Sequence, residues 1–568
     1  MKIGTNDISA VKIGSIDVNK VYLGANLVWQ KVAATLLLDL YPNAEIALDF
    51  FKLRTAYNGN CIRVRRSSDN AELDIGFVDN YIDTASLLTF AGAEDAFIVK
   101  RYDQSGNSND TFVNTAANQP RIVNAGVLVT EGGIAMGDWD GTNDYLATAV
   151  GLNFGTSARS IFTVQKADTI AVSTIVNLAS NSTAGGAWLV SPEVAVRAVA
   201  QGWISLTPIS TDSISLISNI YIGGNIHSGN NMWIDGSSVT RTSGNDGAIN
   251  TQNTVLSEGA QSTASNAFDG RKGTLIVYKS DQTANRTAIE NIINSNYNIY
   301  WDGSQTGLLD DYPSAAAAYS LRALNSAYTG ALIKVRRSSD NATQDIYAKY
   351  DGSLDADSLL TFVGSGDGFV STWYDQSGAG NDAVQASASS QPQIVSSGSV
   401  INENGKISVK FDGTTDYIQN ELSVGPTVTA FAVSRIVSES DYNFIYDSFG
   451  TKGRLRLGLW VTQEYFADNA DGSNIVAFST TASNGSQNLF FAKHTNSNVS
   501  VSVNQDTLQT VASTNFSQNS QYFVIGSRNN GTDHFLDGTI QELIIYPSDQ
   551  SANRAGIETN INDYYTIY

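Results

Sequence analysis

Hydrophobic and polar positions recur with a period of ten over the first thirty residues. Each of the units Lys2–Val11, Lys12–Val21 and Tyr22–Lys31 has an aliphatic residue before a glycine and another aliphatic residue further on. A short apolar run beside a turn built on glycine and polar residues predicts a β-strand. Three such strands would form a small meander, which is too small to be stable unless it packs on something else.

We interpret this segment as a docking module, with a β-extension packed on the first large domain as the alternative. The expected docking residues are Ile3, Ile13, Leu23, Val28 and Trp29.

A much longer repeat relates the two halves of the remaining chain. Arg63–Ala71 returns as Lys334–Ala342, and Tyr102–Gly106 returns as Tyr374–Gly378. The spacing between repeated motifs is nearly constant, which indicates duplication of a whole domain. The predicted domains are residues 1–31, 32–303 and 304–568.

Most apolar runs in each copy are short, and they are rich in β-branched or aromatic residues. Leu275–Tyr278 and Leu543–Tyr546 are continuously apolar and predict strands buried on both faces. Ala44–Tyr57 and Ala315–Tyr328 show apolar residues near helical spacing, and we predict an early helix over each.

We also predict that a helix capped by an aspartate closes each copy. The caps would be Asp281 and Asp549. The predicted fold class is all-β: tandem antiparallel β-sandwiches of the jelly-roll, concanavalin-like type, with a small N-terminal β-repeat module and short closing helices.

Charge and composition narrow the possible functions. The net charge of −21 argues against binding to nucleic acid or to an anionic membrane surface. Cys61 is the single cysteine, so no disulfide framework is expected. The start of the sequence lacks the pattern of a signal peptide, and no apolar run is long enough to span a membrane. We therefore expect a protein that leaves the cell by lysis.

Three kinds of side-chain group are candidates for binding. An aromatic cluster in the second copy would stack on sugar rings, with core packing as the alternative. Its members are Trp460, Tyr465 and Phe466. Two Asp-rich loops could hold Ca²⁺, although we favour structural turns and expect no metal or other cofactor. Their carboxylates are Asp103, Asp110, Asp375 and Asp382. Arg65, Arg66, Arg336 and Arg337 are expected to pair with acidic residues across hairpins, with a glycan or phosphate site as the alternative.

Two family resemblances follow from longer motifs. Phe535–Ile540 with the closing helix, and Asp412–Tyr417, look like parts of a laminin-G or concanavalin-like jelly roll. Ser320–Gly330, Val335–Asp340 and Tyr374–Gly378 are similar to the sandwich domain of α-L-arabinofuranosidases. That resemblance implies a glycoside hydrolase, which needs two carboxylates beside the scissile bond.

The catalytic pattern of that family is incomplete in this chain. The position of one acid holds Arg528, and Glu258 lies near the corresponding place of the first copy in a poorly matching context. The nucleophile motif has no convincing counterpart. We therefore predict that the protein is not an enzyme.

The segment Val21–Trp29 looks like the start of appendage proteins of tailed phages, especially tail-fibre and head-fibre proteins of phages of Bacteroidetes. Our leading hypothesis is a structural component of a bacteriophage virion, a fibre, spike or decoration subunit. It would dock on other virion proteins through residues 1–31, form a homo-oligomer and carry lectin-like domains that could bind host-surface polysaccharide. It would be made in the host cytoplasm and located in the virion.

Two other hypotheses remain. One is an arabinofuranosidase-like glycoside hydrolase, which rests on the front-half resemblance. The other is a bacterial surface adhesin. If a glycan is bound, we expect the second copy to bind it.

Overall fold

In the computed structural model the described parts of the chain include both repeated domains. They are residues 36–169, 173–178, 213–240, 255–260, 266–422, 424–437, 442–450, 455–459, 465–470, 474–479, 485–512, 520–528 and 531–568, with short strands elsewhere. For the strands between residues 2 and 30, and for those at 188–190, 196–198, 202–205 and 243–245, the backbone is described.

Three antiparallel hairpins follow one another over the ten-residue repeats at the N-terminus, and the turn of each hairpin lies within one repeat. The strands are β1 (Lys2–Ile3), β2 (Asn6–Asp7), β3 (Val11–Ile13), β4 (Ile16–Val18), β5 (Lys20–Leu23) and β6 (Asn26–Gln30). The prediction of one strand per repeat was wrong, because the chain reverses within each unit and pairs with itself. The predicted docking residues Ile3, Ile13, Leu23, Val28 and Trp29 all lie in these strands, and their side chains are outside the described residues.

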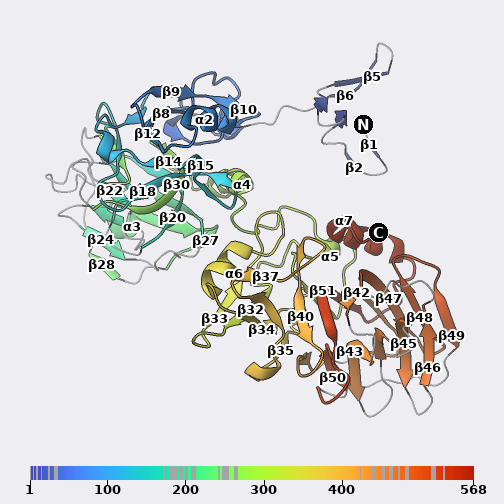
Figure 1. The fold of residues 1–568 in the computed structure, drawn as a ribbon. Coiled ribbons are helices and arrows are strands. Elements are labelled where there is room, and N and C mark those ends of the chain that lie inside the picture. Colours follow the sequence, from blue (N-terminus) through green and yellow to red (C-terminus); the bar gives the residue numbers. More distant parts are fainter. Residues whose placement is uncertain are drawn as a thin grey trace. The chain divides into compact units, whose positions relative to one another are not determined.

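The chain divides into two compact units. The first comprises Met1–Ile209 and Ile217–Ile293, and the second comprises Ser210–Leu216 and Asn294–Tyr568. Each contains one large antiparallel sheet system, with few and short helices. The all-β sandwich prediction is therefore confirmed. The strands of the first unit run from blue to green in Figure 1, and those of the second from yellow to red.

The first unit is built on two long neighbouring strands, β20 and β30. Its strands are β7 (Ala44–Leu48), β8 (Ile62–Arg66), β9 (Glu72–Ile75), β10 (Phe77–Val78), β11 (Tyr81–Ile82), β12 (Ala96–Arg101), β13 (Thr111–Phe112), β14 (Arg121–Asn124), β15 (Val127–Leu128), β16 (Thr130–Glu131), β17 (Ile134–Ala135), β18 (Gly137–Asp140), β19 (Leu146–Thr148), β20 (Arg159–Ala167), β21 (Val176–Leu178), β22 (Trp188–Val190), β23 (Val196–Ala198), β24 (Gly202–Ser205), β25 (Ser215–Tyr221), β26 (Asn230–Ile234), β27 (Ser237–Ser238), β28 (Ser243–Asn245), β29 (Leu256–Glu258) and β30 (Asp269–Tyr278). Its helices are α1 (Leu37–Leu40), α2 (Thr84–Ala91), α3 (Ile226–Gly229) and α4 (Arg286–Tyr297), whose last turn belongs to the second unit.

The second unit repeats this arrangement around β42 and β51. Its strands are β31 (Ala317–Ser320), β32 (Ile333–Arg337), β33 (Thr343–Ile346), β34 (Gly368–Trp373), β35 (Ala383–Val384), β36 (Gln393–Ser396), β37 (Ser399–Val400), β38 (Asn402–Glu403), β39 (Lys406–Ile407), β40 (Val409–Asp412), β41 (Ile418–Asn420), β42 (Val428–Ile436), β43 (Asn443–Gly450), β44 (Leu455–Leu459), β45 (Tyr465–Ala470), β46 (Asn474–Phe478), β47 (Gln487–His494), β48 (Asn498–Val503), β49 (Gln509–Ala512), β50 (Ser520–Ile525) and β51 (Asp537–Tyr546). Its helices are α5 (Leu308–Asp311), α6 (Ala356–Val363) and α7 (Arg554–Tyr565).

The continuously apolar runs form the central strands, as predicted. Leu275–Tyr278 lies in β30, which pairs with β7, β18 and β20, and Leu543–Tyr546 lies in β51, which pairs with β31, β40 and β42. Every residue of both runs is buried, which explains why neither run alternates with polar residues.

The two early helices were predicted wrongly. Ala44–Leu48 is strand β7 and pairs with β30, and Ala317–Ser320 is strand β31 and pairs with β51. Pairing with a buried central strand outweighs the near-helical spacing of a few apolar residues, because local propensity is a weak signal.

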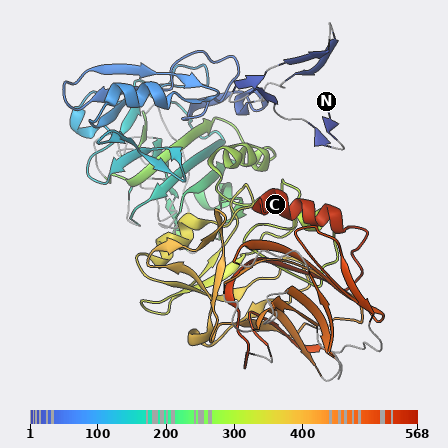
Figure 2. The ribbon, with the colours of Figure 1, turned by 45° about the vertical axis from the view of Figure 1, so that its right-hand side comes forward.

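The closing helices are confirmed, but their predicted caps are not. Helix α7, in red in Figure 2, buries Ile557 and Ile561 against apolar residues of β42, β47 and β51. Asp549 accepts the backbone N–H of Ser551, and Asp281 accepts that of Thr283, so both carboxylates fix the turn ahead of the helix. Among the described helices, none is long and apolar enough to cross a membrane.

Candidate functional site

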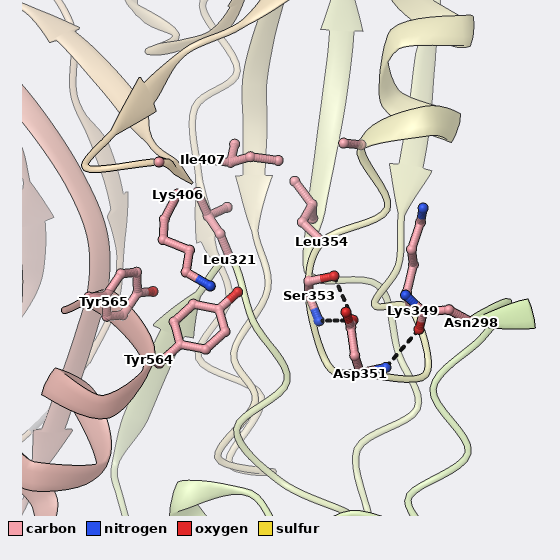
Figure 3. Close-up of a pocket in the computed structure, with 12 residues that line it drawn as sticks. Asn298, Leu321, Lys349, Asp351, Ser353, Leu354, Lys406, Ile407, Tyr564 and Tyr565 are labelled. Carbon is pink, nitrogen blue, oxygen red and sulfur yellow. Dashed lines mark hydrogen bonds between the residues drawn. The ribbon is translucent and has the colours of Figure 1, made fainter. Parts of the chain in front are cut away.

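A pocket of about 350 Å³ opens within the second unit (Figure 3). Small-molecule sites in proteins measure roughly 300 to 1,000 Å³, so one sugar unit would fit. Its wall comes from the segment after α4, the loop ahead of α6, the β38–β39 hairpin and the end of α7. The lining residues are Asn298, Leu321, Lys349, Asp351, Ser353, Leu354, Ala356, Gly405, Lys406, Ile407, Tyr564 and Tyr565.

The loop ahead of α6 is held in shape by the carboxylate of Asp351. Its Oδ1 accepts the backbone N–H of Ser353 at 2.9 Å and the hydroxyl of Ser353 at 2.6 Å. Asp351 itself donates its backbone N–H to Asn298 Oδ1 at 2.9 Å. These bonds fix the position of a carboxylate that remains exposed at the pocket.

Lys349 lies on the same side of the pocket and is held by two acidic residues. Its Nζ is 2.5 Å from Asp357 Oδ2 and 3.9 Å from Asp355 Oδ1. Burial alone would lower the pKa of Lys349, but these carboxylates outweigh it and the pKa is raised. Lys349 is therefore a charged, ion-paired residue at neutral pH.

The opposite wall is a column of charged and aromatic side chains. Glu542 accepts from Arg322 through two bonds, Nε to Oε2 at 2.8 Å and Nη2 to Oε1 at 3.1 Å. The Arg322 guanidinium lies 4.8 Å from the ring centroid of Tyr564, and Lys406 Nζ lies 4.0 Å from the same centroid. Burial raises the pKa of Tyr564 to about 12, so its hydroxyl stays protonated and can donate a hydrogen bond.

A second group of charged side chains surrounds Phe444 of β43, close to the end of the neighbouring strand β50. Arg528 forms a bidentate pair with Asp533, Nε to Oδ1 at 3.0 Å and Nη2 to Oδ2 at 2.8 Å. Arg528 and Arg456 lie 5.7 and 5.8 Å from the Phe444 ring centroid. On the neighbouring strands, Arg456 is directly opposite the buried Asp447. Of the two arginines near the Phe444 ring, Arg528 is thus paired with Asp533, and Arg456 lies opposite Asp447 in the strand register.

The first unit contains a fully buried ionic cluster instead. Glu258 contacts Arg101 Nη1 at 2.7 Å and Lys272 Nζ at 3.6 Å, and it accepts the hydroxyl of Thr111 at 2.9 Å. Burial would raise the pKa of Glu258, but the two cations outweigh it and lower the pKa. Burial lowers the pKa of Lys272 to about 8 against the opposing pull of Glu258. Arg101, Glu258 and Lys272 are each at most 1 % exposed, so the cluster belongs to the core of the unit.

The turn after β40 carries two carboxylates with separated pKa values. Burial, followed by the charge of Asp412, raises the pKa of Asp416 to about 7. Burial would raise the pKa of Asp412 too, but hydrogen bonds from Thr414, Thr415 and Asp416 lower it to about 2. Asp416 Oδ2 accepts the backbone N–H of Asp412 at 3.1 Å, so this pair serves the turn.

We expect an Asp416→Asn variant to be more stable than the native chain at pH 8, by up to about 4 kcal/mol, since the pKa of Asp416 is raised from 3.8 to about 7 and one pKa unit corresponds to about 1.4 kcal/mol. The folded pKa lies above the unfolded value of 3.8, so the native protein loses stability as pH rises from about 4 to 7. Asparagine can still accept the Asp412 N–H. Thermal unfolding at pH 4 and pH 8 tests this, and an equal effect at both values would contradict it.

Of the three predicted glycan-binding aromatics, the structure describes the side chain of Phe466. Phe466 is fully buried and packs on Phe444, with ring centroids 5.6 Å apart, so it is a core residue. Tyr465 lies in β45, and its side chain is outside the described residues. Trp460 lies outside the described residues altogether.

The Asp-rich loops use their carboxylates as turn acceptors. Asp103 accepts the N–H groups of Ala47, Ser105 and Asn109, and Asp110 accepts that of Asp103. The second copy repeats these bonds with Asp375 and Asp382. Among the described residues, no group of three or more His, Cys, Asp or Glu side chains is arranged to hold a metal ion.

The repeated arginines pair partly as predicted. Arg66 contacts Asp69 at 2.7 Å, and Arg337 contacts Asp340 at 2.7 Å. Arg65 and Arg336 instead donate to amide oxygens, those of Gln119 and Gln391, each at 2.7 Å. These side chains therefore cross-link the front half of each sandwich.

Comparison with known proteins finds a similarity to one family over part of the second unit. The sequence model described as the catalytic domain of α-L-arabinofuranosidase B matches residues 308–424, which lie in the second unit. A probable α-L-arabinofuranosidase B of Aspergillus flavus is 44% identical over 75 residues, and the enzyme of Aspergillus oryzae is 44% identical over 76 residues. Each match covers 13% of this chain and 15% of the relative, so the chain spans a small part of the relatives it matches.

Two solved structures that align with part of this chain are arabinofuranosidases. An arabinofuranosidase complexed with arabinofuranosyl-α-1,2-xylobiose aligns with a TM-score of 0.35 and 19% identity, covering 44% of this chain and 62% of that one. A GH54 α-L-arabinofuranosidase soaked with a cyclic sulfate inhibitor aligns with a TM-score of 0.34 and 14% identity, covering 54% and 76%.

These comparisons correct our functional prediction. The hypothesis of a non-enzymatic bacteriophage structural protein was wrong, because the matching family model and the matching curated proteins are those of arabinofuranosidases. The likeness of Val21–Trp29 to phage appendages was too short to outweigh a match over residues 308–424. The comparisons favour the hydrolase, which was our second hypothesis.

Proposed function

We propose that the protein is a glycoside hydrolase that acts on α-L-arabinofuranosides. The match of residues 308–424 to the catalytic domain of α-L-arabinofuranosidase B carries this proposal. It places the family likeness in the front half of the second sandwich, where Ser320–Gly330 and Tyr374–Gly378 hold its densest motifs.

The surroundings of Phe444 supply the two carboxylates that glycoside hydrolysis requires. Asp533 follows β50 in the turn where Arg528 replaces the expected acid, and Asp447 lies on the adjacent strand β43. Asp533 forms a bidentate pair with Arg528, and Asp447 lies opposite Arg456 in the strand register. We propose Asp533, which is partly exposed, and Asp447, which is buried and which substrate binding must uncover, as the catalytic pair.

Incubation of the full chain with arabinan, followed by chromatography of the soluble sugars, tests the proposal. We expect release of free L-arabinose. The Asp447→Asn and Asp533→Asn variants should release it roughly 100-fold more slowly or worse, since a positioned acid or base contributes about 10²- to 10⁴-fold.

Asp311→Asn is the matched control, because Asp311 is exposed and forms no ion pair with any residue that the structure describes. It should leave the rate unchanged. If the native chain releases no arabinose, the proposed function is wrong. If both carboxylate variants keep the native rate, the assignment of the pair is wrong.

A further inference from the structure

The two units differ in the side chains at an isolated β-bridge that lies at the same corner of each sandwich. In the first unit the bridge joins Phe51 to Tyr81, and in the second unit it joins Arg322 to Ser353. The backbone hydrogen bonds next to each bridge match as well. Tyr81 and Ser353 therefore occupy equivalent positions, as do Phe51 and Arg322.

Tyr81 fills this corner in the first unit. Its ring lies 4.8 Å from that of Phe51, and its hydroxyl contacts the backbone N–H of Ala135 at the end of β17. The residue equivalent to Ala135 is Ile407, which ends β39 in the same hairpin register. The tyrosine thus spans the whole distance from the loop to the hairpin.

The same corner of the second unit is the pocket of Figure 3. Ser353 is too short to reach Ile407, and both residues line the space between them. Arg322 does not fill it, because its guanidinium is held by Glu542. In the first unit the position equivalent to Glu542 holds Thr274, whose hydroxyl donates to Asp49 at 2.6 Å. The buried pair at this corner therefore differs between the units, and in the second unit it holds Arg322 beside Tyr564.

The polar groups of the pocket face one another across an apolar floor. Figure 3 shows the Lys406 amine and the Tyr564 hydroxyl on one side and the Asp351 carboxylate on the other. Leu321 and Leu354, both 3% exposed, form the floor between them. Lys406 Nζ forms no ion pair with any described residue, so it is available to a ligand.

A sugar ring matches this arrangement. It offers hydroxyl groups at its edges, which can donate to a carboxylate and accept from an amine or phenol, and C–H groups on its face, which can pack on leucines. The ammonium and the carboxylate lie on opposite walls, which suits a neutral ligand with polar groups on both edges better than an anion or a cation.

We propose that this pocket is a non-catalytic site that binds one neutral sugar unit of the polysaccharide on which the protein acts; its substrate class, an arabinose-containing glycan, rests on the proposed function. It would hold the polymer to the second unit while the carboxylates near Phe444 act. In the first unit Tyr81 occupies the equivalent space, so we expect no sugar to bind at this corner of that unit.

The first unit supplies the variant that tests this inference. Ser353→Tyr places in the second unit the residue that the first unit already accommodates at this corner, so the sandwich is expected to fold. Affinity electrophoresis of the full chain in gels containing arabinan reports binding to the polymer. We expect the native chain to be retarded, Ser353→Tyr to lose at least tenfold in affinity, and Lys406→Met to lose severalfold.

Tyr81→Ser is the matched control and should leave the retardation at its native value. Native retardation of Ser353→Tyr, or no retardation of the native chain, would overturn the inference. Turnover of a small aryl arabinofuranoside is measured separately, and Ser353→Tyr should retain it. If the native chain lacks turnover while its retardation still depends on Ser353, the proposed function fails and the binding site stands.

Discussion

A Glu258→Gln variant is expected to lose about 3 to 5 kcal/mol of folding free energy in its first unit, because it leaves two buried cations without a counter-charge. Arg101 and Lys272 approach Glu258 to 2.7 and 3.6 Å and are screened from water by the sandwich. Glutamine keeps the shape and can still accept the hydroxyl of Thr111. The loss therefore reports the charge rather than a cavity.

The second unit shows which replacement should be tolerated. The residues at the equivalent positions are Trp373, Ile525 and Ile540, as the strand registers of the two units show. Replacing a whole buried ion cluster by packed apolar residues is often neutral or stabilising. The triple variant Arg101→Trp, Glu258→Ile and Lys272→Ile should therefore recover most of the stability. Denaturant unfolding measures both variants, and a loss below about 1 kcal/mol for Glu258→Gln would contradict this account.

A Glu542→Gln variant is expected to lose a similar amount, about 3 to 5 kcal/mol, in the second unit. Arg322 would keep its place beneath Tyr564 but would lose the acid that it contacts at 2.8 and 3.1 Å. Glu542 also accepts the hydroxyl of Ser320 at 2.8 Å, so the network on this side of the pocket weakens. We expect weaker binding to arabinan together with the loss of stability.

Asp340→Asn is the control for Glu542→Gln, because it breaks an ion pair that is exposed rather than buried. Its pair with Arg337 has a similar distance, 2.7 Å, but the two side chains are 49% and 33% exposed. An exposed ion pair contributes about 0 to 1 kcal/mol. Denaturant unfolding should therefore separate the two variants clearly. Equal losses would show that burial does not govern the Arg322–Glu542 pair.

The duplication and the central strands could be read from the sequence. Leu275–Tyr278 and Leu543–Tyr546 are apolar at every position, and only a strand buried on both faces uses such a run. Ala44–Leu48 could not be assigned in the same way, because its pairing with β30 depends on residues far along the chain.

The pocket could not be predicted from the sequence either, because the residues that line it are far apart along the chain. Asn298, Asp351, Lys406 and Tyr564 come from four separate segments. One difference between the two copies points to the pocket in the sequence itself. At equivalent positions the first copy has Tyr81 and the second copy has the much smaller Ser353. The prediction that the protein is not an enzyme rests on the arginine at position 528, where the family has an acid. Asp533 lies in the same turn and contacts that arginine at 2.8 Å, a contact that the sequence alone does not show.

The central claim is that this chain hydrolyses α-L-arabinofuranosides with carboxylates near Phe444. Its most direct test is the rate at which the full chain releases nitrophenol from 4-nitrophenyl α-L-arabinofuranoside, compared with the Asp447→Asn variant. We predict steady release by the native chain and a rate roughly 100-fold lower or less for the variant. No release above the uncatalysed rate by the native chain, or equal release by both proteins, would contradict the claim.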